Sequence, residues 1–166
     1  MTNNDLLIRL RYALDIKDID MVKIFKLGGK TVELEDVKKM LSKPTTDLDD
    51  QPTDANYLAV NDVMLDHFLN GFVVFKRGPR DNNITKEPGD RPLAIEHPNN
   101  LFFKKVKVAL SLTTDDIIEI FKLGDTEVSK SELSALLRKP EHRHYRVCLD
   151  SSLRRFLKGL AIKYRR

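Results

Sequence analysis

Eight basic side chains crowd into the last 24 residues of the chain: Arg143, Arg146, Arg154, Arg155, Lys158, Lys163, Arg165 and Arg166. In a helix that begins near Asp150, several of these side chains fall away from the apolar positions, so we expect them to be exposed together. A phosphate backbone would meet several of these charges at once. The cluster therefore predicts a nucleic-acid-binding surface. The alternative is a solvated helix face whose cations favour the C-terminal end of the helix dipole.

The other residues that could do chemistry are isolated. His142 and His144 form an i, i+2 pair with no third ligand at a matching spacing, so we expect no metal site. Cys148 stands among cations, which can lower the pKa of a thiol, but a buried structural cysteine is the favoured interpretation. The sequence contains no Gly-rich phosphate loop, G-x-S-x-G elbow or H-E-x-x-H pair. We therefore predict no catalytic residues, no cofactor and no enzymatic activity.

An internal duplication supplies the elements that must position these side chains. The pentapeptide IFKLG at residues 24–28 returns unchanged at residues 120–124, and the same offset of 96 residues brings Lys43-Pro44 onto Lys139-Pro140. A repeat at a fixed offset determines the architecture before any other observation is considered. Each copy is near the lower limit of size for independent folding, so we expect the two halves to pack together.

Apolar residues recur with a 3.6-residue period in four stretches of each copy, which predicts an all-α fold of two similar four-helix halves, about eight helices in total. Asn4 and Asn100 stand where an N-cap side chain would accept a free backbone N–H. Gly28 and Gly124 stand where a left-handed C-cap would end the second helix of each half. The S-K-S-E stretch that begins at Ser129 is typical of a capping box.

The fourth predicted helix of each half has a glycine in its middle. Gly71 and Gly159 each cost about 1 kcal/mol of helix propensity relative to alanine, and their recurrence predicts that another helix approaches closely. A Pro- and Gly-rich linker at residues 79–98 separates a first repeat at residues 1–78 from a second at residues 99–166. The relation between the repeats, a pseudo-two-fold axis or a tandem stack, stays open.

The two halves differ in charge. Residues 1–96 carry 14 Lys and Arg against 17 Asp and Glu, whereas residues 97–166 carry 15 against 8. This difference predicts that only the second half presents a surface to an anionic partner, with surface drift after duplication as the alternative. No apolar run approaches the roughly 20 residues of a membrane span, and no secretory signal opens the chain. We expect a cytoplasmic protein without membrane contact, which the single cysteine also favours.

The repeated pattern is similar to that of a known family. The first copy contains LRYAL, IFKLGG, MLSKP and LDHFLNG, and the second contains KVAL, IFKLG, LLRKP and LRRFLKG. Together with the overall length, this pattern resembles the bacterial YehS-like family, whose members carry two copies of a small helical domain of unknown function. The resemblance covers nearly the whole chain. It implies the duplicated helical fold and brings no catalytic or binding residues with it.

Two functions remain open at this point. The first is a non-enzymatic binding module whose basic C-terminal half contacts nucleic acid. The second is a protein–protein interaction or regulatory scaffold that binds a partner in the groove between the two repeats. A salt titration separates them, because only phosphate contacts predict a steep loss of affinity with salt.

Overall fold

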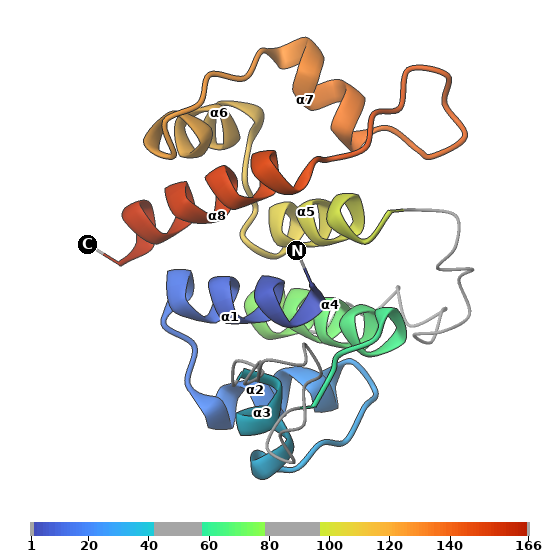
Figure 1. Cartoon of the computed structure of the whole chain (residues 1–166), viewed down its shortest axis with the longest axis vertical. Helices are drawn as coiled ribbons and strands as arrows, with labels where there is room; N and C mark the ends of the chain where they lie inside the picture. The colour runs from blue at the N-terminus through green and yellow to red at the C-terminus, as the bar shows by residue number, and fades with distance from the viewer. Residues whose placement is uncertain (1, 42–57, 79–96, 166) are drawn as a thin grey trace, which may run out of the picture.

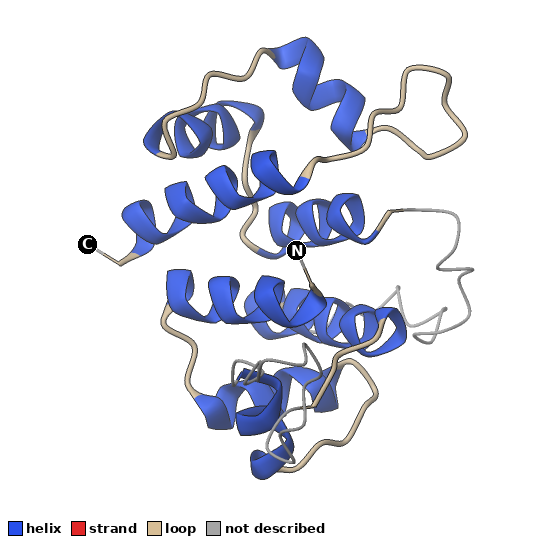
Figure 2. Cartoon of the chain, viewed as in Figure 1, coloured by secondary structure: helices blue, strands red, loops and turns tan. Residues whose placement is uncertain are grey.

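The computed structural model describes residues 2–41, 58–78 and 97–165, and every regular element within them is an α-helix (Figure 2). In chain order these helices are α1 (Asn3–Leu14), α2 (Asp18–Leu27), α3 (Leu34–Leu41), α4 (Asp62–Arg77), α5 (Pro98–Ala109), α6 (Thr114–Leu123), α7 (Lys130–Leu137) and α8 (Asp150–Tyr164). The duplicated all-α fold is confirmed. Most of the predicted linker, residues 79–96, lies outside the described residues. No helix in the described ranges is long and apolar enough to cross a membrane.

An approximate two-fold axis relates the two halves, which are not stacked in tandem. α4 of the first half packs against α5 of the second, and α8 of the second half packs against α1 of the first (Figure 1). Because α1 corresponds to α5 and α4 to α8, exchanging the halves reproduces both contacts. A tandem stack would form the first contact and leave α1 and α8 apart. The pairs α2–α3 and α6–α7 lie at opposite ends of the molecule (Figure 1).

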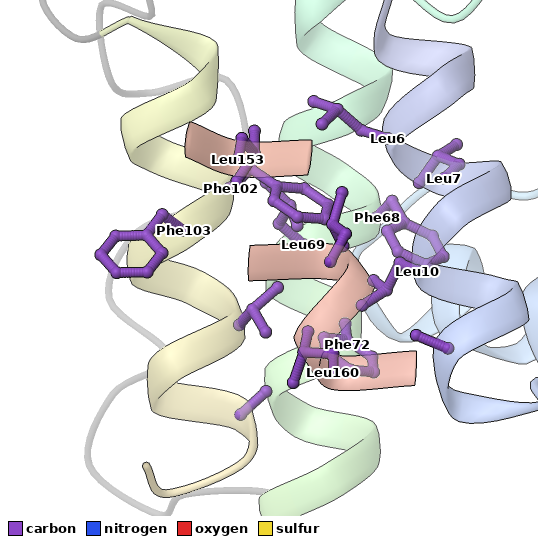
Figure 3. Close-up of a cluster of buried hydrophobic side chains, with 14 of the residues drawn as sticks. Leu6, Leu7, Leu10, Phe68, Leu69, Phe72, Phe102, Phe103, Leu153 and Leu160 are labelled. Atoms are coloured by element: carbon purple, nitrogen blue, oxygen red, sulfur yellow. The ribbon is translucent and has the colours of Figure 1, made fainter. Parts of the chain in front are cut away.

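One apolar core runs through both halves. Leu6 of α1, Phe68 of α4, Phe102 of α5 and Leu153 of α8 come together in the middle of the molecule (Figure 3). All four are buried, and they are members of the periodic apolar stripes that predicted the helices. Each half is too small to bury much apolar surface alone, so the shared core is a major source of stability for both.

The starts of the first helices differ from the prediction. Asn4 and Asn100 are not N-caps, because each lies inside the first turn of its helix and is buried. The caps are Thr2 and His97, whose side chains accept hydrogen bonds from backbone N–H groups of that turn. Ser129 does cap α7, with its side-chain oxygen accepting from the Glu132 N–H, but the reciprocal bond from the Glu132 side chain that would complete the predicted capping box is not formed at this helix.

The buried side chains of Asn4 and Asn100 instead form hydrogen bonds with the backbone of the segment that leads into the fourth helix of each half. The Nδ2 of Asn100 donates to the carbonyl oxygens of Leu136 at 3.2 Å and Arg146 at 2.9 Å. Its Oδ1 accepts from the backbone N–H of Cys148 at 2.7 Å. Asn4 makes the three equivalent bonds in the first half. A buried amide must find partners, and these bonds satisfy it while fixing an otherwise irregular segment.

Gly28 and Gly124 also have a role other than the predicted left-handed C-cap. Their φ angles are −84° and −86°, which any residue adopts. The left-handed positions come one residue later, at Gly29 with φ 91° and Asp125 with φ 67°. A Cβ atom on Gly28 or Gly124 would collide with a backbone carbonyl of α4 or α8. These glycines are therefore required by helix packing.

Gly71 and Gly159 lie at the same two crossings. A Cβ on Gly71 would collide with the carbonyl oxygen of Ile24 in α2, and a Cβ on Gly159 with that of Ile120 in α6. The predicted close approach of another helix is confirmed in both halves. Glycine on both sides of each crossing lets α2 approach α4, and α6 approach α8, at backbone contact.

Candidate functional site

α8 and the loop before it carry the basic residues predicted to form a binding surface. Leu153 and Phe156 face the core, whereas Arg154, Arg155 and Lys158 are exposed, as their helical positions predicted. α8 has 15 residues and is therefore about 22 Å long at 1.5 Å per residue. The cations are spread along this length and do not gather at one point.

Arg155 and Lys158 converge on Asp125, just past the C-terminal end of α6. Lys158 Nζ lies 2.9 Å from Asp125 Oδ2, and Arg155 Nη1 donates to the Asp125 carbonyl oxygen at 3.4 Å. The hydrogen bond from Lys158, together with its charge, lowers the pKa of Asp125. Cations beside the last carbonyls of a helix are also favourable for the helix dipole. These two residues therefore bind the protein itself.

Two further cations contact other helices of the same chain. Lys163 Nζ lies 3.5 Å from a carboxylate oxygen of Glu119 in α6. The Arg165 guanidinium sits over the Tyr12 ring, 4.2 Å from its centroid, and donates to the Tyr12 carbonyl oxygen at 2.8 Å. Arg165 Nη1 also lies 3.6 Å from Asp15 Oδ1. Both cations connect α8 to its neighbours and are partly neutralised there.

Three arginines of the cluster form neither an ion pair with, nor a hydrogen bond to the backbone of, any described residue, whereas Arg155, which also forms no ion pair, bonds the Asp125 carbonyl oxygen. Arg146 and Arg154 are exposed and make no side-chain hydrogen bond within the described ranges, and Arg143 donates only to the ring of His144 at 3.2 Å. They lie on the loop before α8 and on its second turn. Arg166 is outside the described residues. The predicted cluster therefore divides into internally bonded cations and a smaller group available to an external anion.

Cys148 and the two neighbouring histidines lie in different surroundings. Cys148 is buried, and burial raises the pKa of its thiol to about 12, so the thiol stays protonated at neutral pH. This agrees with the structural role favoured from the sequence. His142 and His144 are exposed, and the described residues contain no group of three His, Cys, Asp or Glu placed to hold a metal ion.

A groove of about 420 Å³ runs between the two repeats, along α1 and α8. Its floor is apolar and its rim is charged, and it is lined by Asp5, Ile8, Arg9, Tyr12, Leu157, Lys158 and Ala161. The sequence predicted a groove between the halves but not its residues. The outward apolar positions Ile8 and Tyr12 on the first helix were the available signal, and only the packing of α1 against α8 brings them to a second wall.

Comparison with known proteins identifies a family. The chain is 34% identical over 163 residues to the "Uncharacterized protein YehS" of Escherichia coli (strain K12). The aligned residues make up 98% of this chain and 96% of that protein. No solved structure matches. A family model described as "Protein of unknown function (DUF1456)" matches residues 3–78 and 99–166, the two segments that contain the described helices. With both repeats matched and a relative similar over nearly its whole length, the chain belongs to the DUF1456 family.

Proposed function

We propose that the protein is a non-enzymatic, cytoplasmic module that binds nucleic acid through the second repeat. The observation that carries the proposal is the set of exposed arginines, Arg143, Arg146 and Arg154, that bind no carboxylate or backbone carbonyl of a described residue. Their basic neighbours Arg155, Lys158, Lys163 and Arg165 each do. The excess of 15 Lys and Arg over 8 Asp and Glu in residues 97–166 supports it.

Arginine suits this task because its planar guanidinium binds two phosphate oxygens at once. Phosphate contacts hold a protein on a duplex without reading its sequence, so we expect little sequence preference. Three such contacts predict a slope of log K against log salt of about −3 on duplex DNA, or roughly 40-fold weaker binding at about 200 mM than at about 50 mM salt.

The first repeat lacks the same surface. The positions equivalent to Arg146 and Arg154 are Leu58 and Asp66, and Asp66 is buried. The duplication therefore preserved the helices and changed the side chains that a polyanion would meet. A single anion-binding face on one side of the molecule is the expected result.

The proposal is tested with Arg146→Glu/Arg154→Glu, measured by fluorescence anisotropy on labelled duplexes of mixed sequence from about 50 mM salt upward. The matched control is Lys23→Glu/Lys26→Glu, which changes the net charge equally at two exposed positions of α2. We expect the first variant to bind every duplex more weakly, with a slope shallower by about 2. The control should stay close to the parent protein.

Equal binding by the two variants, or no binding by the parent at about 50 mM salt, would refute the proposal. The apolar floor of the groove between the repeats favours a protein partner as the second candidate function. Such a partner would bind with little dependence on salt, because burial of apolar surface is not screened by ions.

A further inference from the structure

The contact between α1 and α8 that borders the groove has a counterpart in the contact between α5 and α4, to which the approximate two-fold axis relates it. There, Lys105 Nζ donates to Asn70 Oδ1 at 2.7 Å and bridges the two helices. The equivalent residues in the α1–α8 groove are Arg9 and Lys158. Two cations have donors only and cannot bond to each other. The groove therefore lacks the bridge that links α5 to α4, and its rim presents two positive side chains.

Tyr12 is the second difference between the two sites. Arg165 donates to the Tyr12 carbonyl oxygen at 2.8 Å, and the equivalent Arg77 donates to the Val108 carbonyl oxygen at 3.3 Å. The backbone contact is thus the same, while the side chain changes from that of Val to that of Tyr12, a residue that is 59% exposed. Arg165 holds this ring in place from one face. A rigidly held, exposed aromatic ring is the usual platform on which a nucleic-acid base stacks.

The charges around the groove favour an anion. Arg9 and Lys158 line the groove together with one carboxylate, that of Asp5, which accepts a hydrogen bond from the backbone at the start of α1, and a second carboxylate, that of Asp125, pairs with Lys158 from outside the groove. Lys158 also binds Asp125, but its ammonium has three donors and this bond uses one. Arg154 lies one turn before Lys158 on the same exposed face of α8. A phosphate at the rim would therefore meet several cations.

We propose that this groove receives an unpaired base of a single-stranded nucleic acid, which stacks on Tyr12 while its phosphates meet Arg9 and Lys158. The inference rests on the proposed function and adds the kind of nucleic acid. A duplex keeps its base faces inside the stack, so only a single strand offers a face to the ring. Every base has such a face, so the groove adds affinity with little sequence preference.

The test compares a labelled oligothymidylate with a duplex of equal length, by anisotropy at low salt. We expect the parent protein to bind the single strand more tightly. Tyr12→Leu should weaken single-strand binding about 5-fold to 160-fold, the range for loss of one stacked base, and should leave duplex binding unchanged. Tyr12→Phe keeps the ring and should bind like the parent. Val108→Ala, at the equivalent position of α5, is the matched control and should have no effect.

The outcomes separate this inference from the proposed function. If Tyr12→Leu binds oligothymidylate as the parent does while Arg146→Glu/Arg154→Glu loses both probes, the groove site is refuted and the proposed function stands. If the parent binds neither probe, both are refuted. A labelled oligoglutamate peptide is the counter-probe. Tighter binding of that peptide than of oligothymidylate, lost in Tyr12→Leu, would assign the groove to an acidic polypeptide and overturn the inference.

Discussion

Gly159→Ala tests whether backbone contact between α6 and α8 determines the packing of the second half. The new Cβ would collide with the carbonyl oxygen of Ile120, and it would lie 2.7 Å from the Ile120 carbonyl carbon and 3.0 Å from its Cγ2. Carbon atoms pack at about 3.5–4.0 Å, so the two helices would have to separate by roughly 1 Å. The obstacle is helix backbone, which cannot rotate aside as a side chain can.

The expected loss of stability follows from two opposing effects. Alanine gains about 1 kcal/mol of helix propensity over glycine. Overpacking a close contact typically costs about 1–3 kcal/mol, and here the separation would also loosen the contact between Phe121 and Phe156, whose ring centroids are 5.5 Å apart. Because the collision is with backbone, we expect the upper part of that range and a net loss of about 1–2 kcal/mol. Gly159→Leu should lose more.

Thermal unfolding followed by circular dichroism measures this change. A loss of about 1–2 kcal/mol lowers Tm by about 2–8 °C in a chain of this size. Gly71→Ala, at the equivalent crossing of α2 and α4, should behave alike. Ser134→Ala on the exposed side of α7 is the control, because it gains helix propensity without a new contact, and its Tm should not fall. An unchanged or raised Tm for Gly159→Ala would refute the reasoning.

Two further predictions concern the buried groups beside the fourth helix of the second half. Asn100→Leu leaves the carbonyls of Leu136 and Arg146 and the N–H of Cys148 without their partner. Urea unfolding should therefore show that the free energy of unfolding falls by about 2–4 kcal/mol. A fall of less than about 1 kcal/mol would contradict the role given to this amide. Burial raises the pKa of the Cys148 thiol from 9.0, its value in the unfolded chain, to about 12 in the folded protein. Between these two pH values only the unfolded chain releases the thiol proton, so the free energy of unfolding should fall as the pH rises from 9 toward 12. Urea unfolding at pH 8 and about pH 10.5 should show a smaller fall in the free energy of unfolding for Cys148→Ala than for the parent protein. Rapid reaction of the native thiol with a disulfide reagent at pH 8 would contradict this prediction.

The sequence was sufficient for features that depend on neighbours along the chain. Apolar periodicity located the helices, because a helix buries residues three and four apart regardless of what covers them. The repeated pentapeptide at residues 24–28 and 120–124 established the duplication. Gly71 and Gly159 indicated close helix crossings, because a glycine inside a helix is unfavourable unless something requires its missing side chain. Exposure of Arg154 was likewise implied by its place opposite the apolar stripe.

The tertiary structure alone decided what the polar side chains and the second-helix glycines do. Asn4 and Gly28 stand at positions typical of helix caps, yet their partners lie on segments distant in the sequence, so a local pattern assigns them the wrong role. The same holds for the basic cluster, since the groups that bond Lys158 and Arg165 lie on other helices. The groove needs α1 and α8, from opposite ends of the chain, to come together. Local periodicity determines which face of a helix is buried, but the partner of each side chain depends on packing between segments that the sequence does not place side by side.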